Sequence, residues 1–167
     1  INFEKATPPS ALNPDSLFHE GENTTHYSII DKHGNVVSNT YTLGYSFGSG
    51  VTIPGTGILM DNQMNNFAYQ YGDPEVIDRS ASIGNRFEPG KRPMSTMTPI
   101  IIFDENNELK LITGSPGGAL IPAAVLRLVT GVIDFNLNLG EATMLPRLHK
   151  DWPYKNLRLE KGFSKDT

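Results

Sequence analysis

The chain has 167 residues, a formal net charge of −4, 16 glycines, 12 prolines and no cysteine. Its length suits one domain, and its glycine and proline content predicts many loops and tight turns. The acidic balance without any basic cluster excludes a nucleic-acid surface, and no apolar run reaches the roughly 18 residues that a membrane span needs. Without cysteine there is no disulfide framework, zinc knuckle or thiol nucleophile.

An irregular segment precedes the first strand-like region. Residues 1–23 are rich in proline and polar side chains, as in "ATPPSALNPDS", and predict an irregular arm or linker. Residues 25–30 and 36–43 then have the composition of strands, with "DKHGN" between them. Gly34 suits a position of positive φ in that connection. The region is therefore predicted to be a β-hairpin.

The register of this hairpin has a chemical consequence. If Ile30 pairs with Val36, antiparallel pairing places Thr24 opposite Thr42. A shift of one residue would move the two hydroxyls apart. We therefore expect the open end of the hairpin to bring two threonine side chains together.

The second half of the chain predicts another hairpin and two helices. The runs "TPIIIFD" and "ELKLITG" read as strands around Asn106 and Asn107. Pro122 suits the first turn of a helix that continues through "AAVLRLVTGVI". Asn138 is a candidate cap for a shorter helix that ends before Pro146.

A long glycine-rich segment, residues 44–94, separates the two hairpins, and loops of this length are often functional. It begins with "GYSFG", which matches G-x-S-x-G and nominates Ser46 as a hydrolase nucleophile. That motif requires a helix after the serine, and the following "GSGVTIPGTG" disfavours one. We therefore expect a glycine-rich turn here.

The four histidines do not have the spacing of metal ligands, so no zinc site is predicted. His26 lies on the first strand, where we expect a packed and hydrogen-bonded side chain. His33 is expected to be a turn residue. The other two are His19 and His149.

Three further stretches contain candidate binding groups. "GSPGG", residues 114–118, places consecutive backbone N–H groups before a helix, which suits an oxyanion, although a flexible strand-to-helix turn explains it equally well. "KRPMSTMTP" offers Ser95 and Thr96 as a seat for a carboxylate. "DNQMNNF" offers amides for polar substrate groups. The last two patterns are weak by themselves.

Thr24 is the remaining candidate. A threonine hydroxyl is a weak nucleophile unless a base takes its proton, and a freed α-amine on the same residue can do so. Cleavage of the chain before Thr24 would create that group. The alternative is an ordinary polar residue at the start of a strand.

Five sequence blocks occur in order along the chain: "TTHYSIIDKHGNVVSNTYTL", "GILMDNQMNNF", "PGKRPMSTMTP", "LITGSPGGALI" and "EATMLPRLHKDW" followed by "LRLEKGF". Together they resemble the small, C-terminal subunit of γ-glutamyltransferases. The resemblance covers residues 24–167 and implies an α+β fold, an αββα sandwich of the N-terminal-nucleophile hydrolase type, of which this chain is a part. It also implies a precursor that cleaves itself before the catalytic threonine, with residues 1–23 as the tail of the large subunit, which is the expected partner. Residues 24–167 would be a small-subunit region that lacks the last strands.

The resemblance assigns the catalytic roles by motif position. Thr24 corresponds to the nucleophile of both autocleavage and acyl transfer, and Thr42 to the hydroxyl that orients it. Gly117 and Gly118 correspond to the N–H donors of the oxyanion hole. The resemblance implies no metal or organic cofactor.

It also assigns substrate contacts. Ser95 and Thr96 correspond to the pair that binds the α-carboxylate of the donor, with threonine in place of the usual second serine. Gln63 corresponds to an amide near the α-amino group. The arginine that completes this site in the family belongs to the large subunit.

The chain departs from the family at three positions. Asn66 replaces an aspartate that pairs with the α-ammonium of the glutamyl group, which should weaken that contact by about 1–2 kcal/mol. Gly44 replaces an asparagine and removes a further polar contact. In the lid segment, residues 69–85, Ile77 falls nearest to a tyrosine that usually covers the donor.

The resemblance therefore implies a γ-glutamyl hydrolase or transpeptidase that uses glutathione-like donors and an amine or water as acceptor. Asn66 and Gly44 give some weight to relatives that cleave poly-γ-glutamate or remove glutaryl groups from cephalosporins. A different class of function, an uncleaved and non-catalytic fragment, stays open. The family implies a periplasmic or secreted location.

Overall fold

The computed structural model describes residues 23–68, 83–150 and 157–163. Of the predicted N-terminal arm it describes Asn23 alone, and Ile77 and most of the predicted lid lie outside the described residues. The strands are β1 (Thr24–Ile30), β2 (Val36–Thr42), β3 (Ile100–Phe103), β4 (Leu109–Thr113), β5 (Leu148–His149) and β6 (Arg158–Leu159); the helices are α1 (Ile121–Ile133) and α2 (Leu139–Met144), with 3₁₀ turns at Gln63–Asn66, Ile83–Asn85 and Gly118–Leu120.

The first hairpin has the predicted register. Strands β1 and β2 pair antiparallel, with Ile30 opposite Val36 and Thr24 opposite Thr42. The turn between them forms because the Asp31 carboxylate accepts backbone N–H groups of the turn, and because Gly34 supplies the predicted positive φ of 84°. The prediction of this element is confirmed, with each strand boundary within one residue.

The two faces of this hairpin differ in polarity, because successive side chains of a strand point to opposite sides. One face has the polar pairs, among them Thr24 opposite Thr42 and His26 opposite Thr40. The other face exposes large apolar side chains to solvent, namely Tyr27, Ile29, Val37 and Tyr41.

The remaining elements also follow local sequence signals. Strands β3 and β4 form the second hairpin, and Asn107 in its turn has a φ of 63°. Pro122 lies in the first turn of α1, where its missing N–H costs nothing. Asn138 and Glu141 form a reciprocal capping box at the start of α2. These predictions are confirmed.

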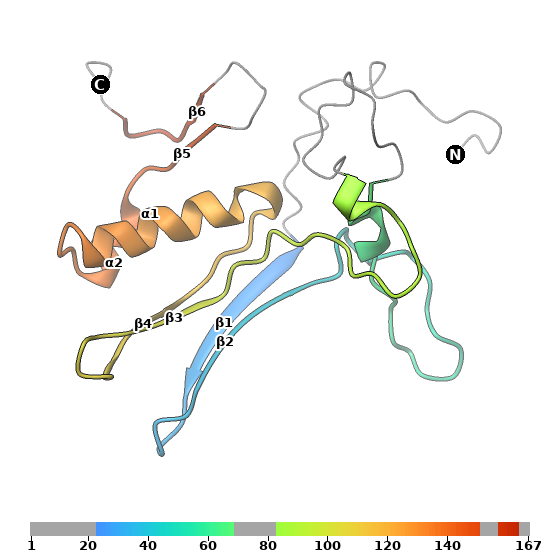
Figure 1. The fold of residues 1–167 in the computed structure, drawn as a ribbon, viewed down its shortest axis with the longest axis horizontal. Helices are drawn as coiled ribbons and strands as arrows, with labels where there is room; N and C mark the ends of the chain where they lie inside the picture. Colours follow the sequence, from blue (N-terminus) through green and yellow to red (C-terminus); the bar gives the residue numbers. More distant parts are fainter. Residues whose placement is uncertain (1–22, 69–82, 151–156, 164–167) are drawn as a thin grey trace.

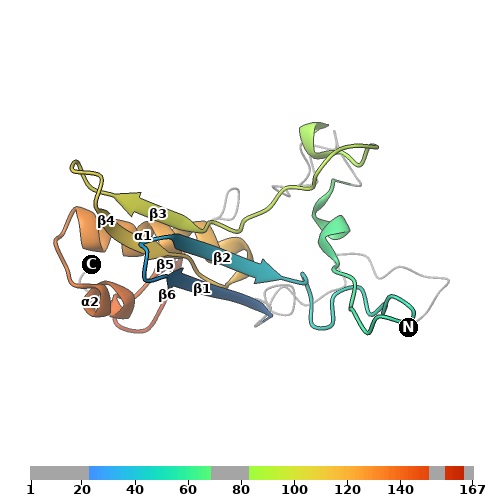
Figure 2. The ribbon, with the colours of Figure 1, turned by 90° about the horizontal axis from the view of Figure 1, so that it is seen from below.

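The described elements stack in layers (Figure 1). Helix α1 lies over one side of the β3–β4 hairpin, and the β1–β2 hairpin lies on the other side; the view from below agrees (Figure 2). Leu111 of β4 and Val125 of α1 are both buried. Ser38 Oγ of β2 donates to the Thr113 carbonyl oxygen of β4, 3.0 Å away, and so joins the two hairpins. The architecture is α+β, with short antiparallel sheets and separate helices.

The apolar core of this part of the chain is small relative to its exposed apolar surface. Beyond the hairpin face described above, Leu126 and Phe135 are 63% and 65% exposed. Exposed apolar side chains therefore lie both on the outer face of the first hairpin and on or next to α1. The described helices include none that is long and apolar enough to cross a membrane. The buried apolar residues are Phe67, Ala68, Leu111, Ile121, Val125 and Ala142.

Candidate active site

The open end of the β1–β2 hairpin joins two hydroxyls. Thr24 Oγ1 donates to Thr42 Oγ1 at 2.9 Å, and the Gly44 N–H donates to the same Thr42 oxygen at 3.0 Å. Strand pairing explains this geometry, because residues directly opposite on one face of an antiparallel pair have adjacent side chains. Thr42 is fixed by a backbone donor and in turn fixes the rotamer of Thr24. We call Thr24, Thr42 and Gly44 the hydroxyl cluster.

The glycine turn, residues 114–118, connects β4 to α1. Gly117 and Gly118 have φ values of 130° and 55°, which L-residues with side chains rarely adopt. A 3₁₀ turn over Gly118–Leu120 then leads directly into α1. Thr96 Oγ1 donates to the Gly118 carbonyl oxygen at 2.8 Å, so Thr96 anchors this turn from a distant segment.

His26 connects the hairpin to the glycine turn. A Cβ on Gly114 would lie 2.3 Å from the His26 ring, so the imidazole packs directly against that glycine. His26 Nδ1 is also hydrogen-bonded to Thr40 Oγ1 at 2.9 Å. Partial burial lowers the pKa of His26 below its ordinary value, which favours the neutral ring. The expectation of a packed, hydrogen-bonded histidine is confirmed.

The side-chain amides of Gln63 and Asn66 are hydrogen-bonded to each other, and we call them the amide pair. Asn66 Nδ2 donates to Gln63 Oε1 at 2.7 Å within one 3₁₀ turn. Asn85 Nδ2 donates to the Asn66 carbonyl oxygen at 2.7 Å, and Asn85 Oδ1 accepts the Met94 N–H at 3.0 Å. Asn85 therefore joins the amide pair to the segment that leads to Ser95 and Thr96.

The other two predicted substrate-contact residues are Ser95 and Gly44. Ser95 is exposed, and its Oγ accepts the N–H of Met97, so this hydroxyl is engaged locally while Thr96 reaches the glycine turn. Gly44 has a φ of 87° and lies against Asn62, whose N–H donates to the Leu43 carbonyl oxygen. This bond holds the segment of the amide pair close to the end of β2.

Two connecting residues could not be assigned from the sequence. Asn85 lies in a segment with no periodic pattern, and its contacts reach 9 and 19 residues away. Gly114 belongs to the predicted glycine turn, but nothing in the sequence pairs it with His26. The sequence indicates only that Gly114 begins the glycine-rich stretch "GSPGG".

The "GYSFG" motif forms a turn, as predicted. The Gly48 N–H donates to the Tyr45 carbonyl oxygen at 2.8 Å, and no helix follows within residues 44–62. Ser46 is therefore not at a nucleophile elbow. No cluster of three potential metal ligands occurs in the part of the chain that the structure describes.

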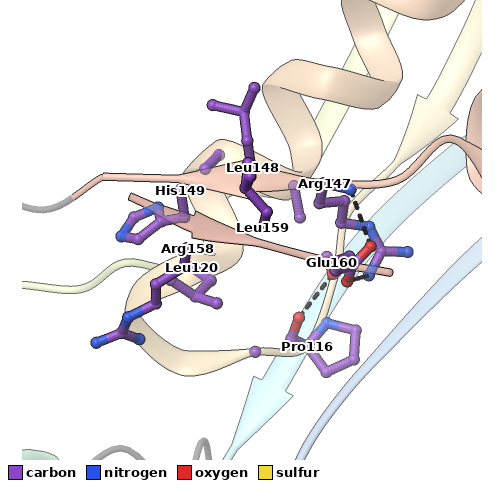
Figure 3. Close-up of a pocket in the computed structure, with 12 residues that line it drawn as sticks. Pro116, Leu120, Arg147, Leu148, His149, Arg158, Leu159 and Glu160 are labelled. Carbon is purple, nitrogen blue, oxygen red and sulfur yellow. Dashed lines mark hydrogen bonds and ion pairs between the residues drawn. The ribbon is translucent and has the colours of Figure 1, made fainter. Parts of the chain in front are cut away.

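A cavity of about 160 Å³ lies beside the glycine turn (Figure 3). Within the described ranges, its walls come from residues 115–124, from strands β5 and β6, and from the adjacent Arg147 and Glu160, whose guanidinium and carboxylate form an ion pair. Neither Thr24 nor Thr42 lines it. The cavity therefore adjoins Gly117 without containing the hydroxyl cluster.

The sequence and the fold are similar to those of known proteins. Over 168 residues the chain is 45% identical to the glutathione hydrolase proenzyme of Escherichia coli (strain K12), in a match that covers 100% of the chain and 29% of that relative. The corresponding protein of Pseudomonas sp. (strain A14) is 39% identical, with the same coverage. The chain thus spans less than a third of the length of these relatives.

Solved structures show the same fold. A mutant of Helicobacter pylori gamma-glutamyltranspeptidase superimposes with a TM-score of 0.76 and 43% identity, over 85% of this chain and 76% of that one. The Bacillus anthracis transpeptidase CapD gives a TM-score of 0.59 and 27% identity, over 85% and 69% of the two chains. The family pattern described as gamma-glutamyltranspeptidase matches residues 1–167. The chain therefore belongs to the gamma-glutamyltranspeptidase family.

Proposed function

We propose that this chain is the catalytic region of a γ-glutamyl hydrolase or transpeptidase whose nucleophile is Thr24. The observation that carries the proposal is the 2.9 Å hydrogen bond from Thr24 Oγ1 to Thr42 Oγ1, the two residues to which the resemblance assigns the nucleophile and its orienting hydroxyl. A second hydroxyl that accepts this bond orients the nucleophile without being consumed.

The first chemical step forms an ester. After cleavage before Thr24, its free α-amine takes the hydroxyl proton while Oγ1 attacks the γ-carbonyl carbon of a glutamyl amide. The N–H groups of Gly117 and Gly118 stabilise the oxyanion, and the departing amine takes the proton as the amide bond breaks. Water or an amine acceptor then attacks the ester and restores Thr24. These steps use no metal or organic cofactor.

The donor is held by its α-carboxylate and α-amino groups. In this proposal Ser95 and Thr96 contact the carboxylate, and Gln63 with Asn66 contacts the amino group. The hydrogen bond from Thr96 Oγ1 to the Gly118 carbonyl oxygen keeps Thr96 beside the glycine turn. In this proposal the Thr96 hydroxyl turns from that carbonyl to the carboxylate when a donor binds, because a hydroxyl has one proton to donate.

Glutathione-like donors are the first candidate, since relatives at 45% and 39% identity are named glutathione hydrolase proenzymes. A second candidate is cleavage of poly-γ-glutamate or of glutaryl amides. It is favoured by Asn66, which is a neutral amide engaged with Gln63. Gly44 also supplies no side chain where the family has an asparagine.

The partner in this proposal is the large subunit of the same precursor, of which residues 1–23 are the tail. The chain would form part of an αββα sandwich, in which the described helix layer and the two hairpins are three layers. The apolar outer face of β1–β2, with Tyr27 and Tyr41 about half exposed, would receive the fourth layer. We place the enzyme in the periplasm or outside the cell, in keeping with the resemblance.

The test uses the complete precursor and intact-mass measurement. Wild-type protein is expected to break between Asn23 and Thr24 and then to turn over γ-glutamyl amides. Thr24→Ala should abolish both events. Thr25→Ala is the matched control, because it removes a neighbouring exposed hydroxyl on the opposite face of the strand.

An unbroken wild-type precursor without turnover would support the non-catalytic alternative. Turnover that survives Thr24→Ala would exclude the proposed nucleophile. A panel of γ-glutamyl, poly-γ-glutamyl and glutaryl amides, applied to the cleaved protein, then ranks the donor classes.

A further inference from the structure

We propose that Ser46, the central residue of the "GYSFG" motif, is a positioning residue for cleavage before Thr24. Its hydroxyl holds the side chain of Asn23, the residue on the other side of the bond to be broken. The inference rests on the proposed function, and it gives a role to a motif that the acyl-transfer mechanism does not use.

The contact flanks the cleavage site on the side opposite the nucleophile. Ser46 Oγ donates to Asn23 Oδ1 at 2.9 Å, while Thr24 Oγ1 donates to Thr42 Oγ1. The two residues that share the peptide bond are therefore held by two separate side chains. Holding Asn23 limits rotation of its carbonyl group relative to the attacking oxygen of Thr24.

Ser46 is presented by a constrained turn. The bond from the Gly48 N–H to the Tyr45 carbonyl oxygen closes this turn around Ser46. Phe47 has a φ of 61°, an uncommon conformation for a residue with a side chain. A Cβ on Gly48 would lie 2.1 Å from the Met60 carbonyl oxygen, so the turn packs closely against the backbone of Met60 and Asp61. The position of the serine hydroxyl is thus set by the backbone around it.

The bond changes in this cleavage balance without a co-reactant other than water. Thr24 Oγ1 bonds to the Asn23 carbonyl carbon, the peptide C–N bond breaks, and the hydroxyl proton moves to the Thr24 nitrogen. Water then adds to the ester carbon, the C–O bond to Thr24 breaks, and a water proton restores the hydroxyl. Asn23 leaves as a carboxylic acid, which releases its proton to solvent and becomes a carboxylate.

This sequence of steps separates the role of Ser46 from that of the catalytic groups. The contact with Asn23 exists only while the peptide bond is intact, so it contributes to cleavage and is absent from later turnover. A change at Ser46 should therefore slow maturation and spare the mature enzyme. A general structural role would affect both.

The experiment measures the first-order cleavage rate of the full precursor and, separately, turnover per cleaved active site. Ser46→Ala should slow cleavage by roughly 2- to 10-fold, the range expected for one lost neutral hydrogen bond. Ser46→Thr should retain most of the rate. Ser49→Ala is the matched control, because Ser49 is an exposed serine of the same loop whose hydroxyl donates to Met60.

Asn23→Ala should slow cleavage to a similar extent, and the double variant with Ser46→Ala should be no slower than either single one, because both remove the same contact. Turnover of the cleaved variants should equal that of the wild type. The inference is overturned if Ser46→Ala cleaves at the wild-type rate, or if Ser49→Ala is slowed equally. Equal losses in cleavage and turnover would also overturn it.

The proposed function fails separately, in the wild-type and Thr24→Ala precursors. If the wild type is not cleaved before Thr24, both proposals fall. If wild-type cleavage depends on Thr24 but is indifferent to Ser46, only the present inference falls.

Discussion

The hydroxyl cluster and the amide pair hold their side chains in different ways. Thr24 and Thr42 meet because two regular strands pair in one register, so backbone hydrogen bonds determine their positions. Gln63 and Asn66 lie in a 3₁₀ turn within a long irregular segment, and side-chain amides such as that of Asn85 hold them. The proposed chemistry thus rests on regular structure, whereas the proposed specificity rests on contacts that single substitutions can change. Changes in the first region should affect catalysis, and changes in the second should affect donor choice.

The largest effect is expected at Thr42. Thr42→Val removes the acceptor for both Thr24 and the Gly44 N–H, so the nucleophile loses its fixed orientation. We expect kcat to fall on the order of 10²-fold, the scale of misplaced reacting groups. Steady-state kinetics per cleaved active site measures this. Thr42→Ser retains the hydroxyl and should keep most of the activity; equal losses in both variants would exclude an orienting role.

The packing of the first hairpin against the glycine turn can be tested at Gly114, which contacts the His26 ring. Gly114→Ala places a methyl group 2.3 Å from the His26 ring and should reduce the free energy of unfolding of the precursor by about 1–3 kcal/mol. Denaturant unfolding measures the change. Adding His26→Ser opens space and should recover part of the loss. A double variant no more stable than Gly114→Ala alone would contradict this account of the packing.

A moderate effect on specificity is expected at Asn66. Asn66→Asp should raise the activity ratio of γ-glutamyl over glutaryl amides by about tenfold, because a carboxylate forms a charge-assisted hydrogen bond with an α-ammonium that glutaryl groups lack. Parallel kcat/KM measurements on the two donor classes check this. Asn65→Asp adds the same charge at the neighbouring exposed residue and should leave the ratio nearly unchanged. A shift toward glutaryl amides would refute the role of position 66.

The smallest effect concerns the pH dependence of stability. Burial lowers the pKa of His26 from its ordinary value of 6.5, so the unfolded chain takes up this proton before the folded chain does. Both states are neutral at this site above about pH 6.5, and stability falls as the pH decreases through the lowered pKa. His26→Gln should flatten that part of the stability curve. Unfolding measured between pH 5 and pH 8 tests this, and an unchanged slope would contradict it.

Sequence patterns predicted the local elements of this chain because their causes are local. Gly34 and Asn107 accept positive φ, Pro122 suits a helix start, and Asn138 caps the next helix. The pairing of Thr24 with Thr42 followed from the same logic, since one short turn determines the register of the whole hairpin. The catalytic roles proposed for Thr24 and Thr42 came instead from the resemblance to a family.

Only the tertiary structure joined elements that are far apart in the sequence. The contact of His26 with Gly114 and the bond from Thr96 to Gly118 depend on how hairpins, loops and helix stack, and no periodic pattern encodes such packing. The contact of Ser46 with Asn23 likewise needed a turn to fold back over 23 residues. Local backbone preferences determine each segment, whereas the position of one segment against another is decided by side-chain packing throughout the molecule.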